Sequence, residues 1–217
     1  CYTDIYINKK PTGGMQVCEK IGGGLKNLLI FHSLSKRSNL AGLRSGFMVG
    51  DKNIIKIFSK LRSYSAPVIP VPVQLLSAKL WCDEKHVIES RRQYQLKFRY
   101  AHKVLSKYTN YEKPEAGFYL WLNVGDGESF AKELYRNFQI KVMPGLYLAK
   151  GTSHNPGKKF VRVSLVHGFA QCKRAINRIE EQIKRLSIFK AARNNDQVNQ
   201  SLKKLRITAK GDENIMP

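Results

Sequence analysis

The stretch Phe31–Gly50, FHSLSKRSNLAGLRSGFMVG, decides how this chain folds. An apolar run at 28–31 predicts a short buried strand, and a second apolar run, at 47–49, follows Gly46. Between them lie Lys36, in a serine-rich turn, and Arg44. A lysine amine at a strand end can form a Schiff base with a carbonyl compound, and Arg44 with the Ser33 hydroxyl could hold a phosphate beside it. A surface loop with two ordinary cations is the alternative interpretation.

The whole segment resembles the lysine signature of the class I/II aminotransferases, which are pyridoxal 5'-phosphate (PLP) enzymes of fold type I. Ser45 departs from that signature, because the family usually has an apolar residue after the arginine. The resemblance implies that Lys36 is the Schiff-base lysine and proton shuttle and that Ser33 and Arg44 hold the cofactor phosphate. The matching positions are Ser33, Leu34, Ser35, Lys36, Asn39, Leu40, Gly42, Arg44 and Gly46.

The same resemblance gives a role to the first residues. The segment 1–6, CYTDIY, is similar to the one whose tyrosine hydrogen-bonds the phenolic oxygen of the cofactor, which implies that role for Tyr2. The family's aspartate, which pairs with the pyridine nitrogen, would lie three residues before Tyr2 and hence before the first residue of the sequence. Asp4 lies on the wrong side of Tyr2 to replace it.

Arg162 lies in the middle of an apolar, alternating segment, 160–166, FVRVSLV. A buried arginine needs an anionic partner, and a structural ion pair with Glu115 or Asp126 is one possibility. The segment also resembles the aminotransferase strand whose arginine holds the substrate α-carboxylate, a group that suits the bidentate geometry of a guanidinium. The resemblance therefore implies a substrate-binding role for Arg162.

Composition limits the other classes of function. The chain has 217 residues and a formal net charge of +22, which favours anionic partners such as nucleic acid. The positive charges are scattered, however, and no zinc-finger, RNP-type or basic-helix signature occurs, so nucleic-acid binding is disfavoured. The four cysteines and five histidines are dispersed, which predicts no metal site. With no signal peptide or apolar run of membrane-spanning length, a cytoplasmic protein with reduced thiols is expected.

The periodicities predict an α/β fold in which β/α structure is followed by a connecting helix and a smaller α+β unit. We expect residues 1–90 to form the C-terminal part of the PLP-binding large domain and residues 91–187 to form a small C-terminal domain. Residues 188–217 are expected to be a flexible basic tail. The predicted strands are 1–8, 28–31, 117–124, 140–143 and 160–166. The predicted helices are 15–21, 51–63, 73–82, 83–107, 128–137 and 169–186, with an extended linker at 66–72.

The resemblance runs from Tyr2 to about Arg185 and implies the C-terminal half of the PLP type I fold, including the small-domain segments PEAGFYLW (114–121) and VMPG (142–145). Loops such as 22–51 and 121–128 are most similar to the succinyldiaminopimelate aminotransferases. This implies a cytoplasmic homodimer that transfers an amino group between glutamate and N-succinyl-2-amino-6-oxopimelate, in diaminopimelate and lysine biosynthesis. There are three alternatives: an aspartate or LL-diaminopimelate aminotransferase, a catalytically dead truncated remnant of such an enzyme, and a basic nucleic-acid-binding protein.

Overall fold

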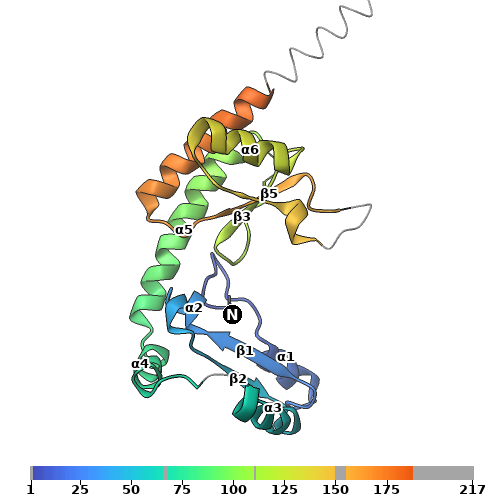
Figure 1. The fold of residues 1–217 in the computed structure, drawn as a ribbon, viewed down its shortest axis with the longest axis vertical. Coiled ribbons are helices and arrows are strands. Elements are labelled where there is room, and N and C mark those ends of the chain that lie inside the picture. The colour runs from blue at the N-terminus through green and yellow to red at the C-terminus, as the bar shows by residue number, and fades with distance from the viewer. Residues whose placement is uncertain (1, 66–67, 110, 150–154, 188–217) are drawn as a thin grey trace, which may run out of the picture. The chain divides into compact units, whose positions relative to one another are not determined.

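A computed structural model describes residues 2–65, 68–109, 111–149 and 155–187, which belong to two compact units (Figure 1). Unit 1 comprises Cys1–His102, Glu112–Leu120 and Val163–Cys172, and unit 2 comprises Lys103–Tyr111, Trp121–Arg162 and Lys173–Pro217. Each unit is therefore built from segments that are distant in sequence. The predicted domain boundary at residue 90 is not tested by this division and stays a prediction, and the predicted tail at 188–217 lies outside the described residues.

Unit 1 contains an antiparallel pair of strands, β1 (Leu29–Ser33) and β2 (Gly46–Gly50), with Leu29 opposite Gly50 and Ser33 opposite Gly46. Gly50 has a φ of 151°, and a Cβ there would collide with the Leu28 carbonyl, so the end of this ribbon requires glycine. A strand, β1, is present where the apolar run at 28–31 predicted one. It is half-buried rather than buried, and Phe31 is exposed. The second apolar run, at 47–49, lies in β2, which was not predicted as a strand.

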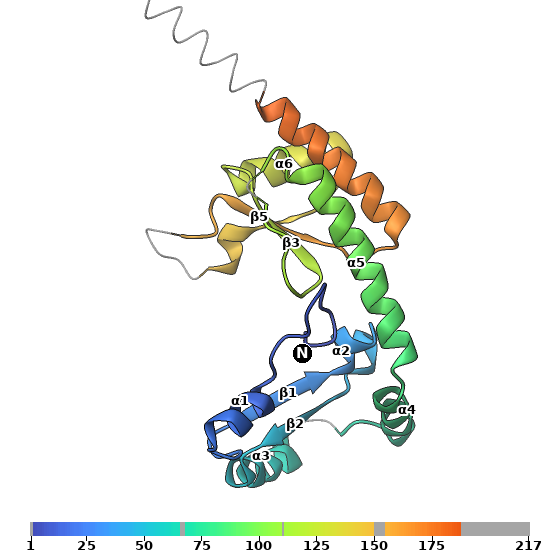
Figure 2. The ribbon, with the colours of Figure 1, turned by 180° about the vertical axis from the view of Figure 1, so that it is seen from behind.

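The helices of unit 1 are α1 (Gly14–Ile21), the single turn α2 (Leu34–Arg37), α3 (Lys52–Ser65), α4 (Val71–Cys82) and α5 (Lys85–Leu105), which continues into unit 2. α2 was not predicted as a helix, whereas α1, α3, α4 and α5 lie where helical spacing predicted them. Asp51 caps α3 as predicted, because its carboxylate accepts the N–H groups of Asn53 and Ile54. The helix α4 begins two residues earlier than predicted, since Pro72 fits within a first helical turn. Figure 2 shows α2 beside the start of α5.

The predicted strand at 1–8 is wrong over the described residues 2–8. This segment forms turns and bends, with one isolated bridge between Tyr6 and Ala116. Only two backbone hydrogen bonds tie it to the chain at that bridge, one from Ile7 N–H to the Glu115 carbonyl and one from Gly117 N–H to the Ile5 carbonyl. A ladder this short does not make a strand, although the alternation of side chains suggested one.

Three short strands form the second sheet, in the order β3 (Tyr119–Asn123), β5 (Phe160–Ser164) and β4 (Met143–Pro144), with β4 and β5 antiparallel. The predicted buried strand at 117–124 is shorter and buries only alternate residues, Leu120 and Leu122. The predicted strand at 140–143 is reduced to Met143 and Pro144. Unit 2 also contains α6 (Gly127–Phe138), η2 (Gly145–Leu148) and most of a helix over 169–187.

The core of each unit is apolar. Unit 1 buries Leu34, Val87, Phe98, Ala101 and Leu165, and unit 2 buries Leu122, Phe130, Leu134, Val161, Ile176 and Ile179. Within the described part of the chain, every helix is too short or too polar to span a lipid bilayer. The same residues contain no cluster of three or more His, Cys, Asp or Glu side chains that could hold a metal ion.

Candidate active site

The turn between β1 and β2 is fixed by its serines. Ser33 caps α2, and its Oγ accepts the N–H of Ser35 at 3.1 Å. The same oxygen lies 2.9 Å from Ser35 Oγ and 3.2 Å from the carbonyl oxygen of Ser45 on the returning chain. Leu34, the next residue, is completely buried. These contacts fix the backbone on both sides of Lys36, which follows two residues later.

Lys36 and Tyr2, two of the predicted site residues, contact the same aromatic ring. Lys36 Nζ lies 4.4 Å from the centroid of the Phe118 ring, within the range of a cation–π interaction. The Tyr2 ring stacks on Phe118 with centroids 5.7 Å apart and an interplanar angle of 26°. Lys36 is half-buried and Tyr2 is largely exposed. Lysine and tyrosine thus share one local environment within unit 1.

Phe118 is held in this position by its backbone. Gly117, with φ 109°, lets the chain turn and donates its N–H to the Ile5 carbonyl at 2.8 Å. The Phe118 carbonyl accepts the N–H of Leu165 at 2.8 Å. Sequence reasoning missed this residue, because the segment GFYLW suggested a strand of structural importance and nothing in it indicated proximity to Lys36.

Arg44 and Ser33 line a common cavity of about 790 Å³ within unit 1. Arg44 adopts a left-handed backbone conformation, φ 52°, and its Nη1 donates to the Ala41 carbonyl at 3.0 Å. Most of the lining is apolar or aromatic, and Arg62 adds a second guanidinium. Lys36 is not among the lining residues. The four predicted residues of unit 1 therefore form two pairs: Ser33 and Arg44 at the cavity, and Lys36 and Tyr2 at the Phe118 ring.

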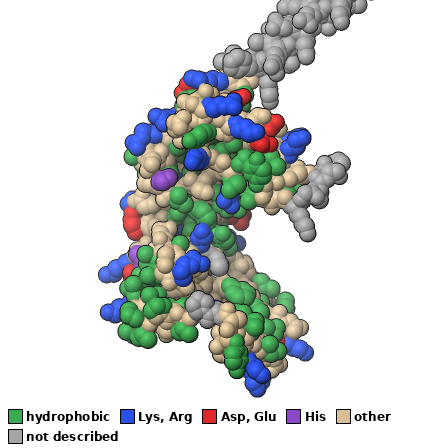
Figure 3. Space-filling model, viewed as in Figure 1, with side chains coloured by type: hydrophobic (Ala, Val, Ile, Leu, Met, Phe, Trp, Pro, Cys, Tyr) green, Lys and Arg blue, Asp and Glu red, His purple; other side chains and the backbone are tan. Residues whose placement is uncertain are grey.

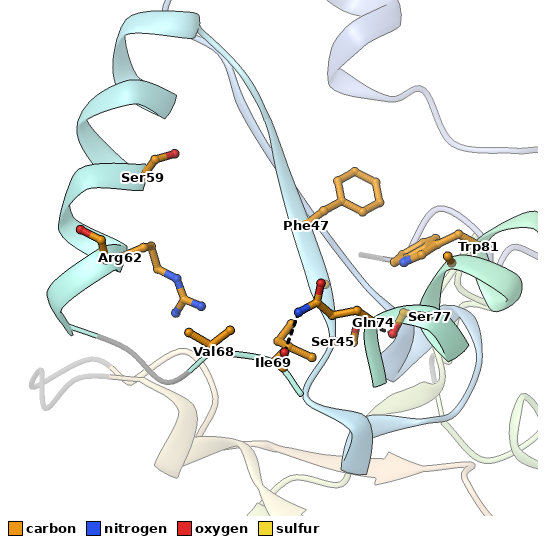
Figure 4. A pocket seen from close by; sticks show the side chains of 12 residues that line it. Ser45, Phe47, Ser59, Arg62, Val68, Ile69, Gln74, Ser77 and Trp81 are labelled. Atoms are coloured by element: carbon orange, nitrogen blue, oxygen red, sulfur yellow. Dashed lines mark hydrogen bonds between the residues drawn. The ribbon is translucent and has the colours of Figure 1, made fainter. Parts of the chain in front are cut away.

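A second cavity of about 620 Å³ lies beside β2, between α3 and α4 (Figure 4). Arg62 extends from α3 toward Val68 and Ile69, and Phe47 points toward Trp81. Gln74 donates to the Ile69 carbonyl at 2.7 Å, which fixes the segment leading into α4. Because Phe47, Arg62 and Val68 line both cavities, the two are neighbours on one side of unit 1.

Ser45, the departure from the family signature, has a hydroxyl partner. It is buried, and its Oγ lies 2.8 Å from the Oγ of Ser77 on α4. Ser77 Oγ also donates to the Val73 carbonyl one turn earlier, at 2.6 Å. A buried hydroxyl is costly unless it is hydrogen-bonded, so Ser77 accommodates a polar residue where the family usually has an apolar one.

Arg37 is a buried cation that sequence reasoning missed. Its guanidinium is only 6% exposed and lies 3.3 Å from Asp4 and 2.5 Å from Glu84. It also donates to the Trp81 carbonyl at 3.3 Å. These contacts connect the residue after Lys36 to the N-terminal segment and to the end of α4. Sequence reasoning assigned Asp4 no role at the cofactor ring, and in the structure its carboxylate contacts the guanidinium of Arg37.

His32 lies next to this ion pair. Its Nε2 is 3.5 Å from Asp4, and its ring packs edge-on against Trp81 and stacked on Phe47. Burial lowers the pKa of His32 below its ordinary value, and the negative charge of Asp4 offsets part of that shift. Burial therefore disfavours the protonated form of the His32 ring.

Arg162 belongs to unit 2, whereas the other four predicted site residues belong to unit 1. It lies at the centre of β5, opposite Met143 on β4, and it is half-buried rather than buried. Asp126, one of the two ion-pair partners considered from sequence, uses its carboxylate to cap α6. The substrate-binding role of Arg162 remains a prediction.

Comparison with known proteins gives a consistent result. The family profile described as aminotransferase class I and II matches residues 9–179. The transaminase OxyQ of Streptomyces rimosus, named for 4-dedimethylamino-4-oxo-anhydrotetracycline, is 30% identical over 76% of this chain and 44% of its own length. LL-diaminopimelate aminotransferase of Natranaerobius thermophilus is 28% identical over 73% of this chain and 41% of its own.

The solved structures agree with the sequence matches. An aminotransferase from Neisseria meningitidis superposes with a TM-score of 0.79 and 43% identity, covering 82% of this chain and 47% of the other. The chain therefore spans about half the length of the relatives it matches. The fold around β1, α2 and β2, the lysine signature in that turn and these matches lead to one conclusion: the chain belongs to the class I and II aminotransferases.

Proposed function

We propose that this chain supplies the lysine-bearing part of a PLP-dependent aminotransferase, with Lys36 as the residue that binds the cofactor covalently. The observation that carries the proposal is the turn between β1 and β2. It holds a half-buried lysine beside the Phe118 ring, on which Tyr2 stacks, and this lysine lies three residues after a serine that shares a cavity with an arginine. Class I and II aminotransferases generally depend on PLP, which supplies an electron sink at the substrate's α-carbon.

The residues present fit such a cofactor in their chemistry. The cavity lined by Ser33 and Arg44 offers a hydroxyl and a guanidinium, the donors that bind phosphate. Tyr2 carries a phenol that can donate to a ring oxygen. With the cofactor bound, the amine of Lys36 would be the base that moves a proton from the α-carbon of the substrate. Arg162 would hold the substrate carboxylate through its bidentate fork.

The substrate pair we propose is glutamate and N-succinyl-2-amino-6-oxopimelate. Support comes from the resemblance of the loops at 22–51 and 121–128 to succinyldiaminopimelate aminotransferases, and from a relative named for LL-diaminopimelate. A homodimer in the cytoplasm is part of the same proposal. The reaction belongs to diaminopimelate and lysine biosynthesis.

Covalent trapping tests the role of Lys36 directly. The purified chain is mixed with PLP, reduced with borohydride, digested and mapped by mass spectrometry. We expect most of the PLP label on Lys36, and we expect the Lys36→Ala variant to lose that label. The control variant Lys26→Ala, which removes an exposed lysine, should keep the label on Lys36. Label spread evenly over the many lysines of the chain would contradict the proposal.

A turnover assay separates catalysis from binding. Glutamate is supplied with the succinylated keto acid, and 2-oxoglutarate is measured. Label on Lys36 without turnover would support the second candidate, a chain that retains the cofactor lysine but is not an enzyme by itself. One observation favours that candidate: Lys36 does not line the cavity that contains Ser33 and Arg44.

A further inference from the structure

The carboxylate of Asp4 lies between the two ends of the turn that carries Lys36. Its Oδ2 is 3.5 Å from Nε2 of His32, the residue directly before Ser33. Its Oδ1 is 3.3 Å from Nη1 of Arg37, the residue directly after Lys36. One carboxylate therefore contacts both flanks of the short segment that contains the predicted phosphate-binding serine and the predicted cofactor-binding lysine.

Asp4 is also part of the turn that carries Tyr2. The Tyr2 carbonyl accepts the N–H of Ile5 at 3.0 Å, which closes a turn around Thr3 and Asp4. The Asp4 carbonyl in turn accepts a hydrogen bond from Nε of Arg91, on α5, at 3.0 Å. The backbone and the side chain of Asp4 are therefore both held, and Tyr2 lies only two residues away.

The Asp4 carboxylate is largely withdrawn from solvent. Its side chain is 13% exposed, and Oδ2 has no hydrogen-bond donor among the described residues. On the face shown in Figure 3, acidic side chains are few and lie apart, among more numerous lysines and arginines. A buried ion pair adds little net stability, because removing both charges from water offsets their attraction. A role in position therefore explains the burial of Asp4 better than a gain in stability does.

We propose that Asp4 is a positioning residue that holds Tyr2 beside Lys36. Its carboxylate fixes the turn of Tyr2 against the segment of Lys36, so that both side chains stay at the Phe118 ring. That ring lies 5.7 Å from the Tyr2 ring and 4.4 Å from Lys36 Nζ. Groups that hold a cofactor tolerate little displacement, since a misplacement of about 1 Å can cost about 100-fold in rate. The inference rests on the proposed function, which assigns Tyr2 and Lys36 to one cofactor.

The partners of Arg37 provide a matched pair of variants. Its guanidinium contacts two carboxylates, those of Asp4 and Glu84. Removing either charge leaves the arginine paired with the other, so neither change strands a buried cation. Glu84 directly precedes α5 and is distant in sequence from Tyr2. Asp4→Asn and Glu84→Gln therefore remove the same kind of charge from the same guanidinium, but only the first releases the turn of Tyr2.

Nuclear magnetic resonance of the full chain without cofactor tests the position of Tyr2. Nuclear Overhauser effects between the Tyr2 and Phe118 rings report their contact, and amide exchange along α5 shows whether the fold is intact. We expect Asp4→Asn to lose the ring contact and Glu84→Gln to keep it. A contact that persists in Asp4→Asn, or that is lost equally in both variants, would overturn the proposal. Faster exchange throughout α5 in Asp4→Asn would do the same, because Asp4 would then serve general stability.

Covalent trapping with PLP and borohydride tests the consequence for Lys36. In Asp4→Asn, the label on Lys36 relative to that on the exposed Lys26 should fall several-fold, and in Glu84→Gln it should match wild type. An unchanged ratio in Asp4→Asn would contradict the positioning role. A wild-type chain without label on Lys36 would contradict only the proposed function, and the ring contact would still decide whether Asp4 positions Tyr2.

Discussion

At the scale of single residues, the pairing of Ser45 with Ser77 shows how one departure from a family signature is accommodated. Serine replaces an apolar residue directly after Arg44, in a position that is buried. Its hydroxyl is matched by another hydroxyl on α4 at 2.8 Å. The two residues are far apart in sequence, and neither predicts the other from its local pattern.

A double-mutant cycle measures this coupling. Ser77→Ala leaves the Ser45 hydroxyl buried without its partner and should lower the free energy of unfolding by about 1–2 kcal/mol. The double variant Ser45→Ala/Ser77→Ala removes both hydroxyls, and its cost should fall below the sum of the single changes by about 1 kcal/mol. Urea denaturation monitored by tryptophan fluorescence gives all four values. Additive single changes would mean that the two hydroxyls are not coupled.

His32 makes a prediction about pH. Burial lowers its pKa in the folded chain, so between that lowered value and its ordinary pKa of 6.5 the unfolded chain binds the extra proton. Stability attributable to His32 is therefore fully present above about pH 6.5 and is lost as the pH falls through this window. His32→Phe keeps the ring contacts with Trp81 and Phe47 but cannot titrate. Its unfolding free energy should fall less steeply from pH 7 to pH 5 than that of wild type; equal slopes would contradict the assignment.

At the scale of elements, two helices depend on aspartate caps of different reach. Asp126 accepts the N–H groups of Glu128 and Ser129 at the start of α6. Asp51 caps α3 in the same way and also accepts the Asn27 N–H from a distant loop, at 2.8 Å. One cap therefore stabilises a single helix, and the other also ties that helix to the loop before β1.

Thermal or urea denaturation measures how much each aspartate cap contributes to stability. Asp126→Ala should lower the free energy of unfolding by about 1 kcal/mol, the usual loss for an N-cap, and Asp126→Ser should restore most of that stability. Asp51→Ala should lower the free energy of unfolding further, because it also leaves the backbone N–H of Asn27, in a second segment, without its acceptor. An Asp51→Ala variant as stable as Asp126→Ala would show that the Asn27 contact contributes little.

Local pattern predicted the elements well where local chemistry determines them. Helical spacing together with Asp51 predicted α3, and the apolar run at 28–31 predicted β1. The segment 1–8 has strand-like alternation, yet its only ladder contact is with Ala116, which no local pattern reveals. Phe118 was missed as a neighbour of Lys36 for the same reason. Contacts between distant segments depend on tertiary structure, and sequence reasoning supplied them only where a family resemblance did.

At the scale of the whole molecule, the excess of positive charge should lower stability by self-repulsion. Thirty-eight lysines and arginines face sixteen aspartates and glutamates, a net charge of +22. Surface ion pairs such as Lys132–Glu128 are exposed and weak, whereas long-range repulsion involves every cation.

We therefore expect the thermal stability of the chain to increase with salt concentration. Raising sodium chloride from low to moderate concentration screens the repulsion between the positive charges, and the midpoint of thermal unfolding should rise by a few degrees. Circular dichroism at 222 nm is a suitable measurement, with a neutral osmolyte at equal osmolality as the control. A midpoint that falls with salt would mean that attractive surface pairs outweigh the net charge.

The Phe118 ring, which contacts both Tyr2 and Lys36, has a consequence for how the protein is made. While the chain is being synthesised, the turn with Lys36 leaves the ribosome well before Phe118 and Leu165, which fix the ring in place. Long-range contacts of this kind form late, after the entropy of closing a large loop has been overcome. A nascent chain thus exposes the lysine before its surroundings exist, and the local environment of Lys36 is complete only after translation has passed the last strand.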